Sequence, residues 1–283
     1  MEEQVSKGFL VIAQNNKETD YVSQAYALAL SIKATQIEHT AISLITNNKV
    51  PKKYKAVFDN IIPIPWEDDA ATSKWKVENR WKFYHVTPYD ETIILDTDML
   101  ILDDLSVWWK YCEMYDIKFC SRITNYKLET VTDKVHRKAF VSNKLPNVYF
   151  ALHYFKKSDT AYEFYKVLEF VVNNWEWCYS KFAPEDYQNW LSMDLAAAIA
   201  IELLGIHQEA YDTVSPLEFT HMKPPLQGWT KLSSSWQDNI PCVFNSRGEL
   251  LLGNIKQDKV FHYVEKNFIT PQILKVLEKR ANG

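Results

Sequence analysis

Two aspartates separated by one residue follow a short apolar run in the first half of the chain. The segment from 91 to 102 reads ETIILDTDMLIL, so Asp96 and Asp98 come directly after TIIL, a four-residue apolar strand. Extended backbone points residues i and i+2 to the same side, so both carboxylates can meet one cation. Hard divalent ions such as Mg²⁺ or Mn²⁺ bind carboxylate and diphosphate oxygens, and they offset the charge of a leaving diphosphate. The pair predicts a divalent metal site, with a solvated turn as the alternative.

The elements before this pair alternate between strand and helix. Apolar runs predict strands at 9–13, 41–45, 61–64, 92–95 and 117–120, and the intervening segments predict helices at 21–33, 75–86 and 105–115. Strands separated by helices indicate a mainly parallel sheet covered on both faces. Such open sheets bind ligands at the carboxyl ends of their strands, which is where the aspartate pair falls.

The second half of the chain predicts a strand at 148–155, a helix that Ser158 caps, and a helix at 192–204 that Gly205 ends. Short strands are expected near 217–222, 241–246 and 259–263, and Thr270 with Pro271 begins a last helix. We find no repeat, low-complexity stretch or linker. The sequence therefore predicts one domain over 1–283, with a nucleotide-binding half at 1–122 and an acceptor-side half with a C-terminal elaboration at 123–283.

Composition limits the class of protein. The 283 residues are 47% hydrophobic and 24% charged, as in an ordinary folded domain. Only six glycines occur, and neither GxGxxG nor GxxxxGK is present, which excludes the glycine-rich phosphate loops. Four cysteines without a CxxC pair indicate free thiols in a reducing compartment. The charged start and the lack of a long apolar run predict a cytoplasmic protein without a membrane span.

Several segments occur in the order typical of the GT-A glycosyltransferases, and within them of family eight, the glycogenin and bacterial galactosyltransferase group. FLVIAQNN at 9–16 resembles the segment that holds uridine, and TDYVSQAY at 19–26 resembles the start of the following helix. Asp96-Thr97-Asp98 resembles the metal motif, and VFHYVEK at 260–266 resembles the C-terminal histidine signature. The resemblance implies a GT-A fold, a UDP-sugar donor, Mn²⁺ or Mg²⁺, and transfer with retention of configuration.

The resemblance also implies roles for individual residues. Asp96, Asp98 and His262 would hold the metal, with His221 as the rival third ligand. The donor would lie against Ala13, Gln14, Asn15, Tyr21, Arg80, Thr97, Asn147 and Lys266. Asp194 is the carboxylate nearest in place to the family's Asp-Gln-Asp element and is the catalytic candidate, although an aspartate here can simply cap a helix. Tyr149 stands where the family has glycine, so the sugar pocket is expected to differ.

The segment 122–144 is a candidate acceptor surface. It carries six basic and two acidic residues, whereas the whole chain has a net charge of −4. A basic patch predicts an anionic acceptor, and Lys134, Arg137 and Lys138 are its candidate contacts. Because such chains are also similar to proteins common in large tailed phages, hydroxymethylated bases in double-stranded phage DNA are one candidate. A glycan, a protein acceptor and a merely solvated face remain open.

Two other functions compete with glycosyl transfer. Phosphatases of the haloacid dehalogenase type also place DxD after a strand, but usually after the first strand of the domain, whereas some 90 residues precede it here. A nucleotide-sugar binder without catalysis would not need both aspartates. Hydrolysis of a donor in the presence of Mn²⁺ separates these cases.

Overall fold

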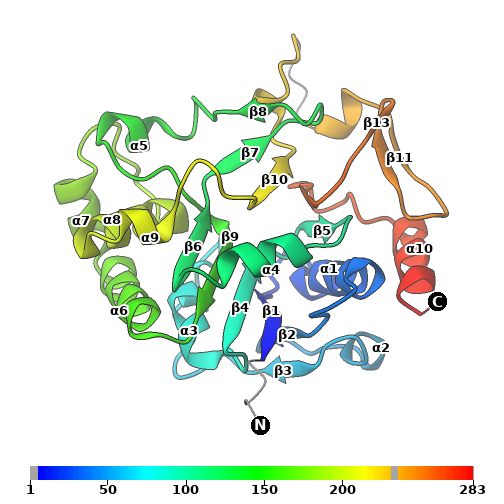
Figure 1. Ribbon diagram of the computed structural model, residues 1–283, viewed down its shortest axis with the longest axis horizontal. Helices are drawn as coiled ribbons and strands as arrows, with labels where there is room; N and C mark the ends of the chain where they lie inside the picture. Colours follow the sequence, from blue (N-terminus) through cyan, green and yellow to red (C-terminus); the bar gives the residue numbers. More distant parts are fainter. Residues whose placement is uncertain (1–5, 231–234, 283) are drawn as a thin grey trace.

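The computed structural model describes residues 6–230 and 235–282, and a six-stranded sheet forms their centre (Figure 1). The strand order is β3-β2-β1-β4-β9-β6. The strands are β1 Lys7–Ile12, β2 Ile42–Ile45, β3 Asn60–Ile62, β4 Glu91–Leu95, β6 Ile117–Cys120 and β9 Tyr149–Lys156. Strands β3, β2, β1 and β4 pair in parallel, as expected, but β9 runs antiparallel to both of its neighbours. The predicted α/β architecture with a mainly parallel central sheet is therefore confirmed, and β9 makes the sheet a mixed one.

Alternating side chains of the inner strands enter two separate cores. Phe9 and Val11 of β1 lie in the core with α1 (Tyr21–Thr35) and α4 (Ser106–Cys112), whereas Leu10 enters the opposite core. That second core contains α6 (Asp159–Asn173) and α8 (Met193–Leu204). Both faces of the sheet are thus covered by helices, which explains why these strands read as continuous apolar runs.

A second sheet carries the C-terminal segment back to the aspartate pair. Its order is β5-β14-β10-β7-β8, with β5 Met99–Ile101, β7 Arg122–Thr124, β8 Thr130–Val131, β10 Glu218–His221 and β14 Val260–His262. Strand β14 pairs antiparallel with β5, so His262 faces Met99, and it pairs in parallel with β10, so His262 also lies beside His221. This sheet fixes which late residues meet the DxD segment.

The caps expected from the sequence are present. The side chains of Ser158, Ser192 and Thr270 accept hydrogen bonds from the first turns of α6, α8 and α10 (Pro271–Ala281), and Gly205 ends α8 with a φ of 66°. The helix expected at 75–86 is shorter than predicted: a 3₁₀ turn, η1 (Glu78–Lys82), leads into α3 (Phe83–Val86), and 66–77 forms a loop.

The remaining elements complete the periphery. The described part also holds α2 Lys52–Lys55, α5 Lys138–Ser142, α7 Trp175–Phe182, α9 His207–Ala210, η2 Pro224–Leu226 and η3 Trp236–Asp238, with the strands β11 Cys242–Phe244, β12 Leu250–Leu252 and β13 Ile255–Lys256. Helix α10 packs against α1 at the edge of the molecule (Figure 1).

All four cysteines are free. None of the helices in the described ranges has the length and apolar character that a membrane crossing needs.

Candidate active site

The aspartate pair lies at the carboxyl end of β4, in the short connection to β5. Asp96 pairs with Arg80, with Nη1 and Oδ1 2.8 Å apart. Oδ2 of Asp98 lies 2.9 Å from Nε2 of His262 and also contacts the Lys266 ammonium. One ligand atom from each of Asp96, Asp98 and His262 lies within 4.8 Å of the others. The predicted carboxylate pair therefore converges with a histidine that follows it by more than 160 positions.

Burial and charge act in opposite directions on the two carboxyl groups. Burial disfavours ionisation of Asp98, but His262 and Lys266 outweigh it and hold the pKa of Asp98 well below its usual range. Burial raises the pKa of Asp96, because Arg80 offsets only part of this penalty and the Asp98 charge adds to it. The site therefore keeps at least one permanent negative charge among three cationic or protonatable side chains.

This donor set suits a divalent cation. Two carboxylates and one imidazole are ligands that Mn²⁺ accepts, and Mg²⁺ accepts the carboxylates more readily than the imidazole. The cations of Arg80 and Lys266 lie against the same carboxylates, so a bound metal would share these anions with them. Nδ1 of His262 is buried without a hydrogen-bond partner among the described residues.

The rival histidine lies one strand further from the carboxylates. His221 stacks on His262 with ring centroids 4.7 Å apart and planes 21° apart. Burial, together with the neighbouring His262, places the pKa of His221 well below its ordinary value. His221 is therefore a neutral ring that supports His262, and it does not belong to the converging Asp96, Asp98 and His262 group.

These residues line a cavity of about 690 Å³. Most of the residues predicted from the sequence contribute to its wall: Gln14, Tyr21, Arg80, Asp96, Thr97, Asp98, Arg137, Asp194, His262 and Lys266. The Lys266 ammonium lies 5.5 Å from the centre of the Tyr21 ring, so the helix start and the C-terminal segment meet across the cavity. A cavity of this size, apolar in part and with convergent polar groups, is typical of a small-molecule site.

Three other predicted donor residues do not line this cavity in the described part of the chain. Ala13 is fully buried. Asn15 holds the start of α1, because its Oδ1 accepts from the Val22 amide at 3.0 Å. Asn147 is half-buried, and its Oδ1 has no hydrogen-bond partner among the described residues. Within the described chain, these three side chains are absent from the cavity lining.

Asp194 also lines the cavity, and two hydrogen bonds hold it in a fixed position. Its Oδ2 accepts from Arg137 Nη2 at 2.7 Å, and its Oδ1 accepts from the Phe150 amide at 2.7 Å. The Arg137 guanidinium also stacks over the Tyr149 ring, 3.8 Å from its centroid. Ser192, not Asp194, caps α8. Tyr149 thus packs against the arginine that orients Asp194.

The basic segment 122–144 does not expose all of its charges. Arg137 is 4% exposed and paired with Asp194, whereas Lys134 and Lys138 are exposed. Arg122 is partly exposed and pairs with Glu218 at 2.8 Å. Of the three candidate acceptor contacts, only the two lysines are therefore available to solvent, and neither lines the cavity within the described chain.

Sequence reasoning missed several residues of the cavity wall. Trp75, Lys76, Trp190 and Lys223 line it, and all four lie in loops or at strand ends. Burial lowers the pKa of Lys223, although Asp133 lies 3.8 Å from its ammonium. The one available signal was the high number of tryptophans, ten in the chain, which a packed core alone does not require.

Comparison with known proteins supports the fold. No family model matches the chain, and no curated protein matches its sequence. The solved structure of galactosyltransferase LgtC with donor and acceptor sugar analogs aligns at 12% identity over 97% of this chain and 95% of its own, with a TM-score of 0.54. Mouse xyloside xylosyltransferase 1 aligns at 10% identity over 94% and 100%, with a TM-score of 0.53.

A third similar structure is longer than this chain. The bifunctional glycosyltransferase WbbM aligns at 10% identity and a TM-score of 0.51 over 99% of this chain, which spans half of WbbM. Three glycosyltransferases of different lengths thus share the arrangement of sheets and helices described above. The chain has the α/β fold of the GT-A glycosyltransferases over nearly its full length.

Proposed function

We propose that this protein is a metal-dependent glycosyltransferase that transfers a sugar from a nucleotide-sugar donor, a UDP-sugar, to an acceptor hydroxyl. The observation that carries the proposal is the convergence of Asp96, Asp98 and His262 on the wall of a 690 Å³ cavity in a GT-A fold. A divalent ion bound there would offset the charge of the leaving diphosphate as a Lewis acid.

The side chains around the metal group divide into two sets. Gln14 and Tyr21 lie at the β1 end of the cavity and are suited to hold the nucleoside through an amide and an aromatic ring. Arg80 and Lys266 now contact the carboxylates and are suited to contact the donor diphosphate when it enters. Arg80 and Lys266 would then exchange a carboxylate partner for the diphosphate, so no further cationic side chain has to move into the cavity.

Asp194 is proposed to orient the donor sugar or the acceptor hydroxyl. Its two oxygens each accept one hydrogen bond from the protein, and a carboxylate has room for further donors. The exposed Trp190 lies two residues before Ser192 and lines the same cavity, which gives an incoming acceptor an aromatic surface. Transfer with retention rests on the resemblance to family eight.

The acceptor stays open among a glycan, a protein and DNA. Hydroxymethylated phage DNA remains a prediction from the sequence, and its test is charge reversal of Lys134 and Lys138 alone, because reversal of Arg137 would also disturb Asp194. Loss of transfer to DNA with donor hydrolysis intact would support a DNA acceptor. Unchanged transfer would assign these lysines to a solvated face.

Donor turnover tests the proposed function. Mass spectrometry would follow UDP-xylose, UDP-glucose, UDP-galactose and the N-acetyl forms of the two hexoses with Mn²⁺ or EDTA, without and with an acceptor panel of simple glycosides and hydroxymethylated DNA. We expect Mn²⁺-dependent release of UDP from one donor. Binding of UDP without turnover of any donor would indicate a non-catalytic binder, and release of phosphate from a phosphomonoester would indicate the phosphatase alternative.

A further inference from the structure

A second hollow lies outside the donor cavity, between the 66–69 loop, the η1–α3 segment and the end of α6. Its volume is about 460 Å³. We name it the outer site, and its lining residues are Trp66, Glu67, Asp69, Trp81, Lys82, His85, Glu169 and Asn173. None of these residues lines the cavity that holds the metal group. Aromatic rings, carboxylates and an amide therefore gather at a place that the transfer reaction does not use.

Trp66 presents a flat indole surface to solvent. Its ring stacks on Trp81 with centroids 5.6 Å apart and planes 8° apart, and His85 meets its edge at 5.3 Å. Trp81 is 7% exposed, but Trp66 remains 67% exposed, so the outer ring covers the inner one and its own second face is open. An exposed indole that two neighbouring rings already hold in place is suited to bind a flat ligand on its open face.

The backbone holds Trp66 in this position. Trp66 has a φ of 56°, in the left-handed region that a bulky side chain rarely adopts. The Trp81 indole N–H donates to Asp69 Oδ2 at 3.2 Å, and the buried Lys82 ammonium lies 3.0 Å from the same oxygen. The platform is therefore built by the loop and η1 together, and it does not depend on a ligand to form.

The polar groups around the platform determine which ligand it can bind. Asp69 is paired with Lys82, but within residues 6–230 and 235–282 no basic side chain pairs with the carboxylates of Glu67 or Glu169. Two carboxylates without an ion-pair partner disfavour an anionic ligand and offer acceptors to hydroxyl groups. Because Trp66 and Trp81 stack on each other and do not face each other across a gap, they form a platform and not a cage for a cation.

We propose that the outer site binds a neutral saccharide, with a pyranose ring lying on Trp66 and its hydroxyls donating to Glu67 and Glu169. A sugar ring has the apolar C–H face that an indole can cover and the hydroxyl rim that carboxylates and the Asn173 amide can bind. This binding needs neither a nucleotide nor a metal, so it does not depend on the proposed transfer activity.

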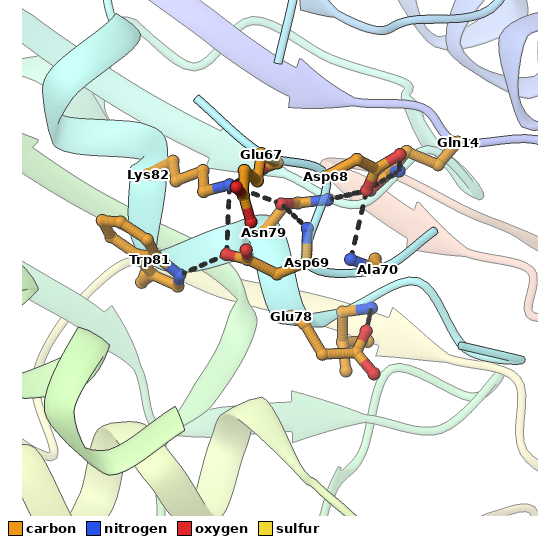
Figure 2. A network of polar contacts seen from close by, with 10 residues as sticks. Gln14, Glu67, Asp68, Asp69, Ala70, Glu78, Asn79, Trp81 and Lys82 are labelled. Atoms are coloured by element: carbon orange, nitrogen blue, oxygen red, sulfur yellow. Dashed lines mark hydrogen bonds and ion pairs between the residues drawn. The ribbon is translucent and has the colours of Figure 1, made fainter. Parts of the chain in front are cut away.

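The outer site is joined to the donor cavity by one continuous hydrogen-bond network, which Figure 2 shows. Gln14 lies at one end and donates to Asp68 at 3.0 Å. Asn79 donates to both Gln14 and Asp68, and its Oδ1 accepts from Lys82 at 2.8 Å. Asp68 thus faces the donor side, while its neighbours Glu67 and Asp69 line the outer site.

Saccharide titrations test the proposal directly. Maltotetraose, cellotetraose, mannotetraose and chitotetraose would be titrated in saturation-transfer NMR and calorimetry, with UDP and Mn²⁺ present to compete for the donor cavity. We expect one of them to bind the native protein and the Trp66→Ala variant to bind it about tenfold or more weakly. Trp177→Ala, which removes a 53% exposed tryptophan outside both sites, should bind like the native protein.

The same titrations separate this proposal from the proposed transferase function. Asp98→Asn should lose donor turnover but keep saccharide binding at the outer site. Tetramethylammonium would be titrated as the cationic alternative. The proposal is overturned if none of the four saccharides binds, if binding survives in a folded Trp66→Ala variant, or if only tetramethylammonium binds at Trp66.

Discussion

The imidazoles of His221 and His262 stack 4.7 Å apart, yet only His262 contacts Asp98. The register of β10 beside β14 produces this arrangement, because it places the two histidines directly opposite each other. One ring can therefore act on the metal group while the other supports it from behind.

We expect His262→Ala to weaken Mn²⁺-dependent UDP binding by at least about tenfold and His221→Ala to weaken it less, because only His262 is a proposed metal ligand. Isothermal calorimetry with UDP and Mn²⁺ measures both. The reverse ranking would make His221 the ligand.

Asp98→Asn should reduce Mn²⁺-dependent donor turnover by more than about 100-fold, because it removes a proposed metal ligand and the negative charge that Lys266 and His262 surround. Turnover is measured as UDP release, and a melting curve checks the fold. Asp103→Asn, an exposed carboxylate beyond β5, is the matched control. Full native activity in EDTA would contradict the metal requirement.

Asn79→Ala should raise the KM for the donor about several-fold with little change in kcat, because Asn79 holds Gln14 from behind the cavity wall. The buried Lys82 also loses a partner, so the free energy of unfolding should fall by about 1–3 kcal/mol. Steady-state kinetics and urea titration measure the two effects. A fall in kcat at constant KM would speak against a role in donor binding.

Arg137→Met and Asp194→Asn should give non-additive losses of transfer rate, because the two side chains form one unit. The guanidinium holds the carboxylate, so once either is changed the second substitution should cost little more. A double-mutant cycle on the transfer rate tests this. Strictly additive effects would mean that Arg137 acts independently of Asp194.

His153 makes stability depend on pH. It is fully buried in β9, and burial lowers its pKa to about 3, below the value of about 6.5 in an unfolded chain. Between these two pKa values the unfolded state binds a proton at His153 that the folded state does not bind. The contribution of neutral His153 to the free energy of unfolding is therefore present above about pH 6.5 and is lost as the pH falls toward 3.

The replacement His153→Gln should remove this pH-dependent contribution, because glutamine does not titrate. The free energy of unfolding should then fall less steeply between pH 6.5 and 4, by up to about 1.4 kcal/mol per pH unit. Urea titrations at several pH values measure it. His207→Gln, on a partly exposed histidine that pairs with Glu202, is the control, and an unchanged slope in His153→Gln would remove His153 as the cause.

The sequence predicted the inner strands, because their apolar runs are buried on both faces. It predicted the starts of three later helices, α6, α8 and α10, because Ser158, Ser192 and Thr270 are clear N-caps. The sequence also predicted where Asp96 and Asp98 lie, because the end of a buried strand fixes the position of the residues that follow it. The direction of β9 was missed because pairing direction depends on a long connection that local periodicity does not report.

Residues that reach the cavity from loops escaped prediction. Trp75 and Trp190 lie in irregular segments, where no period distinguishes a ring that lines a cavity from one that packs in the core. Arg137 was assigned to a basic surface because charge counts do not reveal burial, and its partner Asp194 follows 57 positions later.

The pairing of β14 with β5 has a consequence for how the protein is made. Asp98 and His262 are 164 positions apart, so during synthesis two carboxylates leave the ribosome long before the imidazole that completes their group. Closing so long a loop is slow compared with local helix formation, and it can occur only after the last strand has been made. An ion that binds the complete group stabilises the finished fold and not its precursors. Divalent-ion affinity should therefore report the completion of folding, and a pulse of Mn²⁺ during refolding should bind tightly only when β14 docks.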